Sequence, residues 1–337
     1  VLQWPTREAT LAAVQLIDTP VLRILSLSDD RSEPRFAEIP VDAFKNGSTD
    51  YREACELFQK NPSTQWSSYV AGAVLVLMRE QGLSLQGGLS ILLYSNVPEA
   101  KGVSSSAALE VAAMRAILEA LGITCTPTQL ALWCQLVENK VAGAPCGIMD
   151  QMTSACGEEG ELLALRCQPA QLLNPIVFPD DLEIWGLDSG IRHAVSGSDY
   201  GSVRVGAFMG YRIIAGLAGL DVQPVGHVGR VRIQDPTWNG YLCNITPETF
   251  QGGFEAHLPE SISGHDFLKT YGGTTDPVTR IEPDNTYAVR TPSAHPVYEN
   301  ARVESFARLL QEPASAERNQ ALGQLMYESH ASYSACG

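Results

Sequence analysis

The stretch Val97-Pro-Glu-Ala-Lys-Gly-Val-Ser-Ser-Ser-Ala-Ala108 organises the first half of this 337-residue chain. The apolar run Leu89 to Ser95 before it predicts a strand, and apolar residues at helical spacing from Ala107 to Leu121 predict a helix. Amide groups at such a helix start have no partner inside the helix. Together with the helix dipole they favour an anion such as a phosphate group.

The loop between this strand and this helix carries groups that suit a phosphate. Gly102 lets the backbone approach a ligand closely, and the hydroxyls of Ser104, Ser105 and Ser106 can bond phosphate oxygens or a hydrated Mg²⁺. The loop matches neither the Walker pattern G-x-x-x-x-G-K-[ST] nor the dinucleotide pattern G-x-G-x-x-G. The alternative interpretation is that the three serines only cap a buried helix.

A second segment, Glu138-Asn-Lys-Val-Ala-Gly-Ala-Pro-Cys-Gly-Ile-Met-Asp-Gln151, separates two carboxylates by a loop rich in Gly and Pro. Glu138 ends a helical pattern, and Asp150 is expected at the start of the next element. Metal-assisted phosphoryl transfer uses one carboxylate to hold Mg²⁺ and another to orient or deprotonate the attacking hydroxyl. The alternative is that both are ordinary helix-end charges or N-caps.

The residues at this point resemble a known family. Pro98-x-x-x-Gly102-Val-Ser-Ser-Ser-Ala-Ala108, followed by Cys146-Gly-Ile-Met-Asp-Gln151, resembles the second motif and the catalytic loop of the GHMP small-molecule kinases, specifically their galactokinase branch. Val103 stands where this family usually has Leu. Further segments that agree with the branch are Trp66–Gly72, Ser198–Arg204 and His295–Val303. Segments that look most like its L-arabinokinase group are Val1–Ala9, Met149–Gly157 and Leu187–His193.

The resemblance covers essentially the whole chain and implies an α/β (α+β) fold of two domains. Residues 1–176 are expected to form the ATP- and Mg-binding domain, of the ribosomal-protein-S5-like type. Residues 177–337 are expected to form a ferredoxin-like domain. Periodicity alone predicts only an α/β protein of two domains, with a break near Cys167 to Pro179.

Local patterns beyond and before that break give further expectations. We expect a helix over 64–81, a strand over 182–188 and a helix over 202–217. The stretch 226–291 is expected to be irregular, apart from a short helix near 262–271. The aromatic rings of Trp66 and Tyr69 are expected to pack in a core.

The family resemblance also implies roles for individual residues. Asp150 is expected to be the catalytic base or orienting carboxylate, and Glu138 with Ser105 the partners of Mg²⁺. Residues expected at the ATP phosphates are Gly102, Val103, Ser104, Ser105, Ser106 and Ala107. Sugar contacts are expected from Asp150, Gly147 and Tyr200, although burial of Tyr200 between domains is the alternative.

These roles imply an enzyme that uses ATP and Mg²⁺ to phosphorylate the anomeric hydroxyl of a monosaccharide, with L-arabinose expected as the sugar. Galactose, a uronic acid, or sugar and ATP binding without phosphate transfer, as in galactokinase-like sensors, remain alternatives. We expect the chain to be a fragment. It starts just after the point where the family's first motif would lie, and it stops before the Gly-rich third motif.

The composition agrees with a cytoplasmic small-molecule enzyme. A net charge of -15 and a pI near 4.8 argue against a nucleic-acid or anionic-membrane surface. No secretory signal or membrane-spanning segment is visible. The eight cysteines show no C-x-x-C pair, which favours free thiols over a zinc site. The expected partners are therefore the sugar and ATP, and the protein is expected to be a monomer or a weak homo-oligomer.

Overall fold

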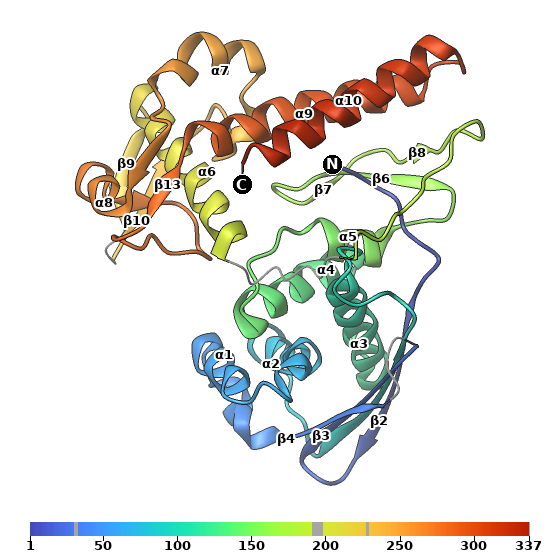
Figure 1. Cartoon of the computed structure of the whole chain (residues 1–337). Coiled ribbons are helices and arrows are strands. Elements are labelled where there is room, and N and C mark those ends of the chain that lie inside the picture. Colours follow the sequence, from blue (N-terminus) through green and yellow to red (C-terminus); the bar gives the residue numbers. More distant parts are fainter. Residues whose placement is uncertain (30–32, 191–197, 227–228, 337) are drawn as a thin grey trace. The chain divides into compact units, whose positions relative to one another are not determined.

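The computed structural model describes residues 1–29, 33–190, 198–226 and 229–336, without the side chains of Ser28 and residues 198–200. The chain divides into two compact units (Figure 1). The N-terminal unit comprises residues 2–177 together with the described residues from Glu183 to Gly190. The C-terminal unit comprises Val1, Phe178–Leu182 and the described residues from Ser198 onward. The division is therefore not a single cut in the sequence, because residues 183–190 group with the earlier part of the chain.

A four-stranded mixed sheet supports the N-terminal unit. Its strands are β2 (Thr10–Ile17), β3 (Val21–Ser28), β4 (Arg35–Pro40) and β5 (Gly88–Ser95), in the spatial order β2-β5-β3-β4. β3 and β5 are parallel, and the other neighbours are antiparallel. The cross-strand partners Ile24 and Ile91 are buried, whereas the next pair, Leu25 and Leu92, is exposed. One face of the sheet is therefore covered, as the period-2 alternation of a strand requires.

Helices cover that face. They are α1 (Tyr51–Gln59), α2 (Ser68–Gln81), α3 (Ser105–Leu121), α4 (Pro127–Leu136) and α5 (Met149–Cys156), with the 3-10 turns η1 (Val41–Gly47) and η2 (Gln65–Ser67) and the π-helical turn η3 (Val137–Ala142). α2 is buried from Val70 to Met78. At Gly72 an added Cβ would lie 2.7 Å from Val137 Cγ1, so the glycine allows α2 to pack closely on η3, the turn that carries Glu138.

A second small sheet lies beside α5. β6 (Glu161–Arg166) pairs antiparallel with β1 (Leu2–Gln3), β7 (Gln171–Leu172) and β8 (Ile176–Val177). The pairing of β1 with β6 brings Gln3 to the start of the site described below.

The C-terminal unit is also a mixture of helices and strands. Its helices are α6 (Ser198–Leu217), α7 (Pro247–Gly253), α8 (Gly264–Tyr271), α9 (Arg290–Leu310) and α10 (Ala316–Ser334), with the turns η4 (Leu242–Asn244) and η5 (Glu255–His257). β10 (Gly229–Gln234) pairs antiparallel with β9 (Asp221–Pro224) and parallel with β12 (Gly273–Thr274). β11 (Ser261–Ser263) pairs with β13 (Thr286–Ala288).

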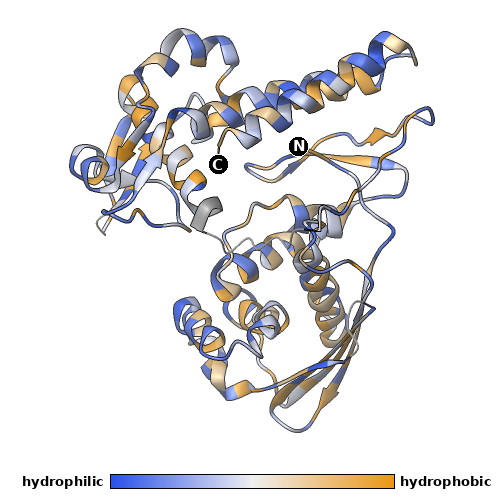
Figure 2. Ribbon diagram, viewed as in Figure 1, coloured by the Kyte–Doolittle hydropathy of each residue, from blue (hydrophilic) through white to orange (hydrophobic). Residues whose placement is uncertain are grey.

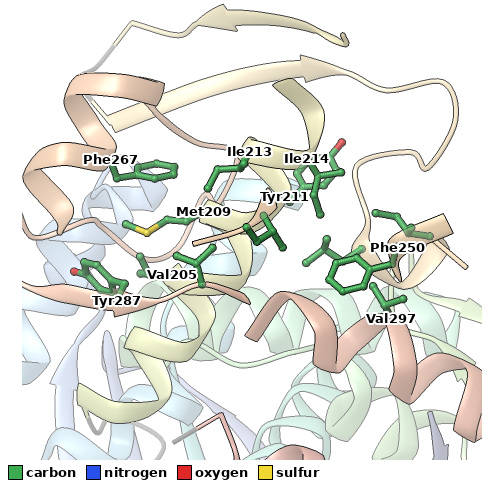
Figure 3. Packing of buried hydrophobic residues seen from close by; sticks show 13 residues of the cluster. Val205, Met209, Tyr211, Ile213, Ile214, Phe250, Phe267, Tyr287 and Val297 are labelled. Carbon is green, nitrogen blue, oxygen red and sulfur yellow. The ribbon is translucent and has the colours of Figure 1, made fainter. Parts of the chain in front are cut away.

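The core of this unit forms around α6 (Figure 3). Val205 and Met209 of α6 pack in one cluster with Phe250 of α7, Phe267 of α8 and Val297 of α9. Hydrophilic and hydrophobic residues are interspersed along α9 and α10 (Figure 2), which fits helices that bury one face only.

Several local expectations hold and two are wrong. α3 begins at Ser105, and the expected helix 64–81 is formed by η2 followed by α2. The strand expected over 182–188 is absent. Its side chains Trp185 and Leu187 are 79% and 92% exposed, so no packing favours an extended pair there. The short helix expected near 262–271 is α8, but the rest of the stretch 226–291 is not irregular, because it contains β10 to β13 and α7.

Among the described residues, no helix has both the length and the apolar character that crossing a membrane requires.

Candidate active site

The loop before α3 has an unusual backbone. φ is positive at Ala100, Gly102 and Ser104, with values of 58°, 73° and 61°. Left-handed conformations are strained for residues with a Cβ atom, and such strain is common at ligand sites. Around Gly102 an added Cβ would meet nothing within 4 Å, so the loop opens to solvent there.

Ser104 is the N-cap residue of α3, but its side chain makes no capping hydrogen bond. The interpretation that the serines only cap the helix is therefore wrong for Ser104. In the described part of the chain, no hydrogen bond is made to the amides of Gly102, Val103 or Ser105. Val103 is 46% exposed, and Ala107 is buried below the loop. The N-terminus of α3 thus presents unpaired donors, the arrangement that binds an anion.

Glu138 lies in η3, which continues α4 by one wider turn. The chain then returns through residues 143–148, and the side chain of Asn139 fixes this return. Its Oδ1 accepts from the Cys146 amide at 2.9 Å, and its Nδ2 donates to the Cys146 carbonyl at 3.3 Å. This return brings the first turn of α5 against Glu138.

Four polar side chains meet below the loop, and we call them the polar cluster: Ser106, Glu110, Glu138 and Gln151. Gln151 Nε2 donates to Glu138 Oε2 at 2.6 Å and to Glu110 Oε2 at 3.2 Å. Burial, together with the nearby Glu138 carboxylate, raises the pKa of Glu110 well above its usual range. Burial also raises the pKa of Glu138, although hydrogen bonds from Ser106 and Cys146 oppose the shift.

The donor set fits the Mg²⁺ of a nucleotide better than a resident metal. Within the described residues, no group of three or more His, Cys, Asp or Glu side chains could hold a metal ion. Mg²⁺ is commonly held by one or two carboxylates together with substrate phosphates. Glu138 and the Ser106 hydroxyl that bonds it supply such a pair beside the anion site. This hydrogen bond comes from Ser106, and in the described part of the chain Glu138 receives none from Ser105, the serine expected to share the metal with it.

Asp150 lies in the first turn of α5, as the loop pattern predicts. It does not cap the helix, since the N-cap residue is Ile148 and no side-chain cap bond forms. Its Oδ1 accepts from Gln3 Nε2 at 3.1 Å. Asp150 lines a cavity of about 1020 Å³ together with Gly102, Val103 and Ser104. We call this the Asp150 cavity.

Several other residues expected at the site are not among those that line the Asp150 cavity: Ser105, Ser106, Ala107 and Glu138. Gly147 is partly exposed, and a Cβ there would meet only the end of Met149, at 3.9 Å. The backbone of Tyr200 lies in the first turn of α6 rather than in a loop, and its side chain falls outside the described residues.

A second cavity, of about 450 Å³, adjoins η3 and was not anticipated. Trp66, Ser68, Tyr69 and Ala142 are among its lining residues. Trp66 Nε1 and Ser68 Oγ are buried and have no hydrogen-bond partner among the residues that the structure describes. Tyr69 lies close enough to the polar cluster for burial, Glu138 and Glu110 to raise the pKa of its hydroxyl. The Trp66-x-x-Tyr69 spacing is the sequence signal for this cavity, although aromatic residues on a helix are also typical of core packing.

Comparison with known proteins shows which families this chain is similar to. Residues 68–158 match the family described as GHMP kinases N terminal domain. The chain is 42% identical over 350 residues to an L-arabinokinase of Arabidopsis thaliana, covering 99% of this chain and 34% of that protein. It is 36% identical over 155 residues to a galactokinase of Chloroflexus aggregans, covering 46% of this chain and 39% of that protein. The chain therefore spans between a third and two fifths of the length of these relatives.

Among solved structures, Lactococcus lactis galactokinase complexed with galactose matches with a TM-score of 0.61 and 19% identity, over 97% of this chain and 67% of that one. This match concerns the fold. The sequence matches assign residues 68–158 to the GHMP kinase N-terminal domain family, and they show that the chain as a whole is similar to an L-arabinokinase and to galactokinases.

Proposed function

We propose that this protein is a kinase that transfers the γ-phosphate of ATP to the anomeric hydroxyl of a monosaccharide, with L-arabinose as its preferred sugar. One observation carries the proposal: the Asp150 carboxylate and the open phosphate-type loop line the same cavity. A carboxylate beside an anion site is the pairing that phosphoryl transfer to a hydroxyl needs. The sequence relationship to an L-arabinokinase supports the choice of sugar.

In this proposal the residues divide the work. The amides of Gly102, Val103 and Ser105 bind phosphate oxygens, and the hydroxyl groups of the loop serines add donors. Glu138 and Ser106 would hold Mg²⁺, which neutralises part of the phosphate charge when bound. Asp150 orients the anomeric hydroxyl and accepts its proton as the new O–P bond forms. Gln3 holds the Asp150 carboxylate in place through its amide.

The second cavity suits the base of the nucleotide. It offers the aromatic rings of Trp66 and Tyr69 as apolar surface and two buried donors, Trp66 Nε1 and Ser68 Oγ, that have no partner. A buried donor without a partner is costly, and purine ring nitrogens are acceptors that would satisfy it. Through Tyr69 this cavity adjoins the polar cluster, so a base placed there leaves its phosphates within reach of Glu138.

The test is a substrate panel. ADP release is measured with L-arabinose, D-galactose, D-galacturonate and D-glucuronate, and we expect the highest kcat/KM for L-arabinose. L-Arabinose has the ring configuration of D-galactose without the exocyclic hydroxymethyl group. Exclusion of that group by packing alone gives a discrimination of about 1–3 kcal/mol, or roughly 10- to 200-fold. Preference for a uronic acid would contradict the choice of sugar, and preference for galactose would move the protein to galactokinase activity.

The same panel separates an enzyme from a sensor. Calorimetric binding of ATP and sugar without any ADP release would mean that the protein binds both ligands and does not react them. In that outcome the kinase proposal fails, although the binding site would stand.

A further inference from the structure

Gln151 is a buried amide that joins two carboxylates from different parts of the fold. Its exposed fraction is 0%, and those of Glu110 and Glu138 are 1% and 4%. Glu110 comes from α3, Glu138 from η3 and Gln151 from α5. The amide nitrogen of Gln151 therefore ties together the helix that begins at the phosphate loop, the turn that carries Glu138 and the helix that carries Asp150.

Two buried carboxyl groups bonded to one amide stabilise the fold less well than apolar side chains would. Two buried carboxylates raise each other's energy, and Glu110 Oε1 and Gln151 Oε1 have no hydrogen-bond partner. Each buried polar atom left unpaired costs about 1–3 kcal/mol, and apolar side chains of similar size could fill this space without that cost. A side chain with two N–H donors is, however, well suited to hold two carboxylates in fixed positions.

The position of Gln151 in α5 adds a second consideration. Consecutive residues of a helix point about 100° apart, so Asp150 and Gln151 cannot face the same side. Asp150 lines the Asp150 cavity, and Gln151 is directed into the interior at Glu138. One helical turn therefore fixes both the carboxylate proposed as the base and the carboxylate proposed for the metal.

We infer that Gln151 is a positioning residue that holds the Glu138 carboxylate in the orientation that receives the nucleotide's divalent cation, with Glu110 as its second anchor. This inference rests on the proposed function. Groups that orient a metal ligand typically change metal affinity by about 10- to 100-fold when they are replaced.

The experiment measures metal binding directly. Mn²⁺ replaces Mg²⁺, and its binding to the purified protein in the presence of ADP is followed by electron paramagnetic resonance. We expect Gln151→Met, which keeps the length of the side chain and removes both donors, to weaken Mn²⁺ binding about 10- to 100-fold. The affinity for sugar should not change. Gln135→Met is the matched control, because Gln135 is a partly buried glutamine of α4 whose Nε2 donates to the Cys146 carbonyl, at 3.4 Å, and contacts neither carboxylate among the described residues. It should bind Mn²⁺ as the unmodified protein does.

Glu110→Gln gives an independent measurement if Gln151→Met does not fold. It preserves the shape of the anchor but replaces one of its two acceptor oxygens by an N–H donor, so Mn²⁺ binding should weaken by a smaller factor. Unchanged Mn²⁺ affinity in a folded Gln151→Met or Glu110→Gln protein overturns the inference and leaves the proposed function intact. If the unmodified protein shows no ADP-dependent Mn²⁺ binding, the proposed role of Glu138 fails, and the inference fails with it.

Discussion

Two turns of this molecule both contain residues with positive φ, but their backbone amides differ in whether the protein supplies an acceptor for them. The loop before α3 has positive φ at Gly102 and Ser104, and the turn after β10 has positive φ at Asn239 and Gly240, with values of 55° and 87°. In the second turn the Asp235 carboxylate accepts from the amides of Thr237, Trp238 and Gly240 at 3.0, 2.8 and 2.9 Å, and from the Tyr211 hydroxyl at 2.6 Å. In the first turn no carboxylate plays that part among the described residues.

The difference separates a turn that the protein itself stabilises from a loop that we propose as a ligand site. In the turn at Asp235 the protein supplies its own anion, and the strained backbone is stabilised by internal hydrogen bonds. In the loop before α3, Gly102, Val103 and Ser104 line the Asp150 cavity, and we propose that a bound ligand supplies the anion there. Positive φ alone does not identify a binding loop. The useful observation is positive φ together with backbone donors that no group in the described part of the chain satisfies.

The strongest test of this contrast places a negative charge at each turn. Ser105→Asp puts a carboxylate where we expect the nucleotide phosphates. At about 4 Å and an effective dielectric constant near 20, two unit charges repel by about 4 kcal/mol, so ATP affinity should fall roughly 1000-fold. Calorimetric titration with ATP checks this expectation.

Thr237→Asp is the control for that substitution. It adds the same charge to the turn at Asp235, where the backbone donors are already satisfied. ATP affinity should stay as in the unmodified protein, and the melting temperature reports any cost to the fold. Equal loss of ATP affinity in both variants would show that overall charge matters more than the loop, and unchanged affinity in Ser105→Asp would rule out the phosphate placement.

A second test asks whether Asp150, at the wall of the same cavity, serves the chemistry or the fold. Asp150→Asn keeps the size of the side chain and its ability to accept from Gln3, but an amide cannot take a proton. We expect kcat to fall by roughly 100-fold or more, while ATP affinity and melting temperature change little. Steady-state kinetics with the sugar that the panel selects gives kcat.

Two other results of that experiment are informative. Near-normal turnover would mean that Asp150 does not act as the base, and another group would have to be sought along the cavity. A parallel fall in turnover and melting temperature would assign Asp150 a mainly structural role through its bond to Gln3.

The sequence was sufficient for the parts of the site that depend on local rules. The strand, the small-residue loop and the helix at Ser105 follow from periodicity and from the lack of partners at a helix start. Asp150 at the start of α5 follows from a Gly/Pro loop that no helix can cross. Both features can be predicted because residues near each other in the chain decide them.

The parts that were missed depend on packing between distant residues. Gln151 reaches a carboxylate 41 positions away, and nothing in the pattern around it indicates that partner. The bond of Ser106 to Glu138 depends on how α3 meets η3, so three consecutive serines could not be distinguished by sequence alone. The strand expected over 182–188 fails for the opposite reason, since its apolar residues favour a strand but no neighbouring strand pairs with it in the described chain.

The smallest expected effect belongs to the turn at Asp235, and it concerns stability as a function of pH. Burial raises the pKa of Asp235, but hydrogen bonds from Trp238, Tyr211, Gly240 and Thr237 outweigh burial and lower its pKa below the usual value. A carboxyl group with a lowered folded-state pKa stabilises the protein fully above its unfolded pKa, near 3.9, and this stabilisation is lost as the pH falls through the folded pKa.

Asp235→Asn keeps one acceptor oxygen and removes the charge. Because a hydrogen bond to a charged acceptor contributes about 1 kcal/mol more than a neutral one, the variant should lose about that much at pH 7, with ATP affinity unchanged. Urea unfolding at pH 7, 5 and 3 should show the same difference at the two higher values and a smaller one at pH 3. Asp221→Asn, at an exposed carboxylate that accepts only from Gln223, should show little difference at any pH. A difference in the free energy of unfolding between Asp235→Asn and the unmodified protein that stays constant down to pH 3 would mean that the Asp235 charge does not stabilise the turn. The contrast between the two turns would then rest on backbone geometry alone.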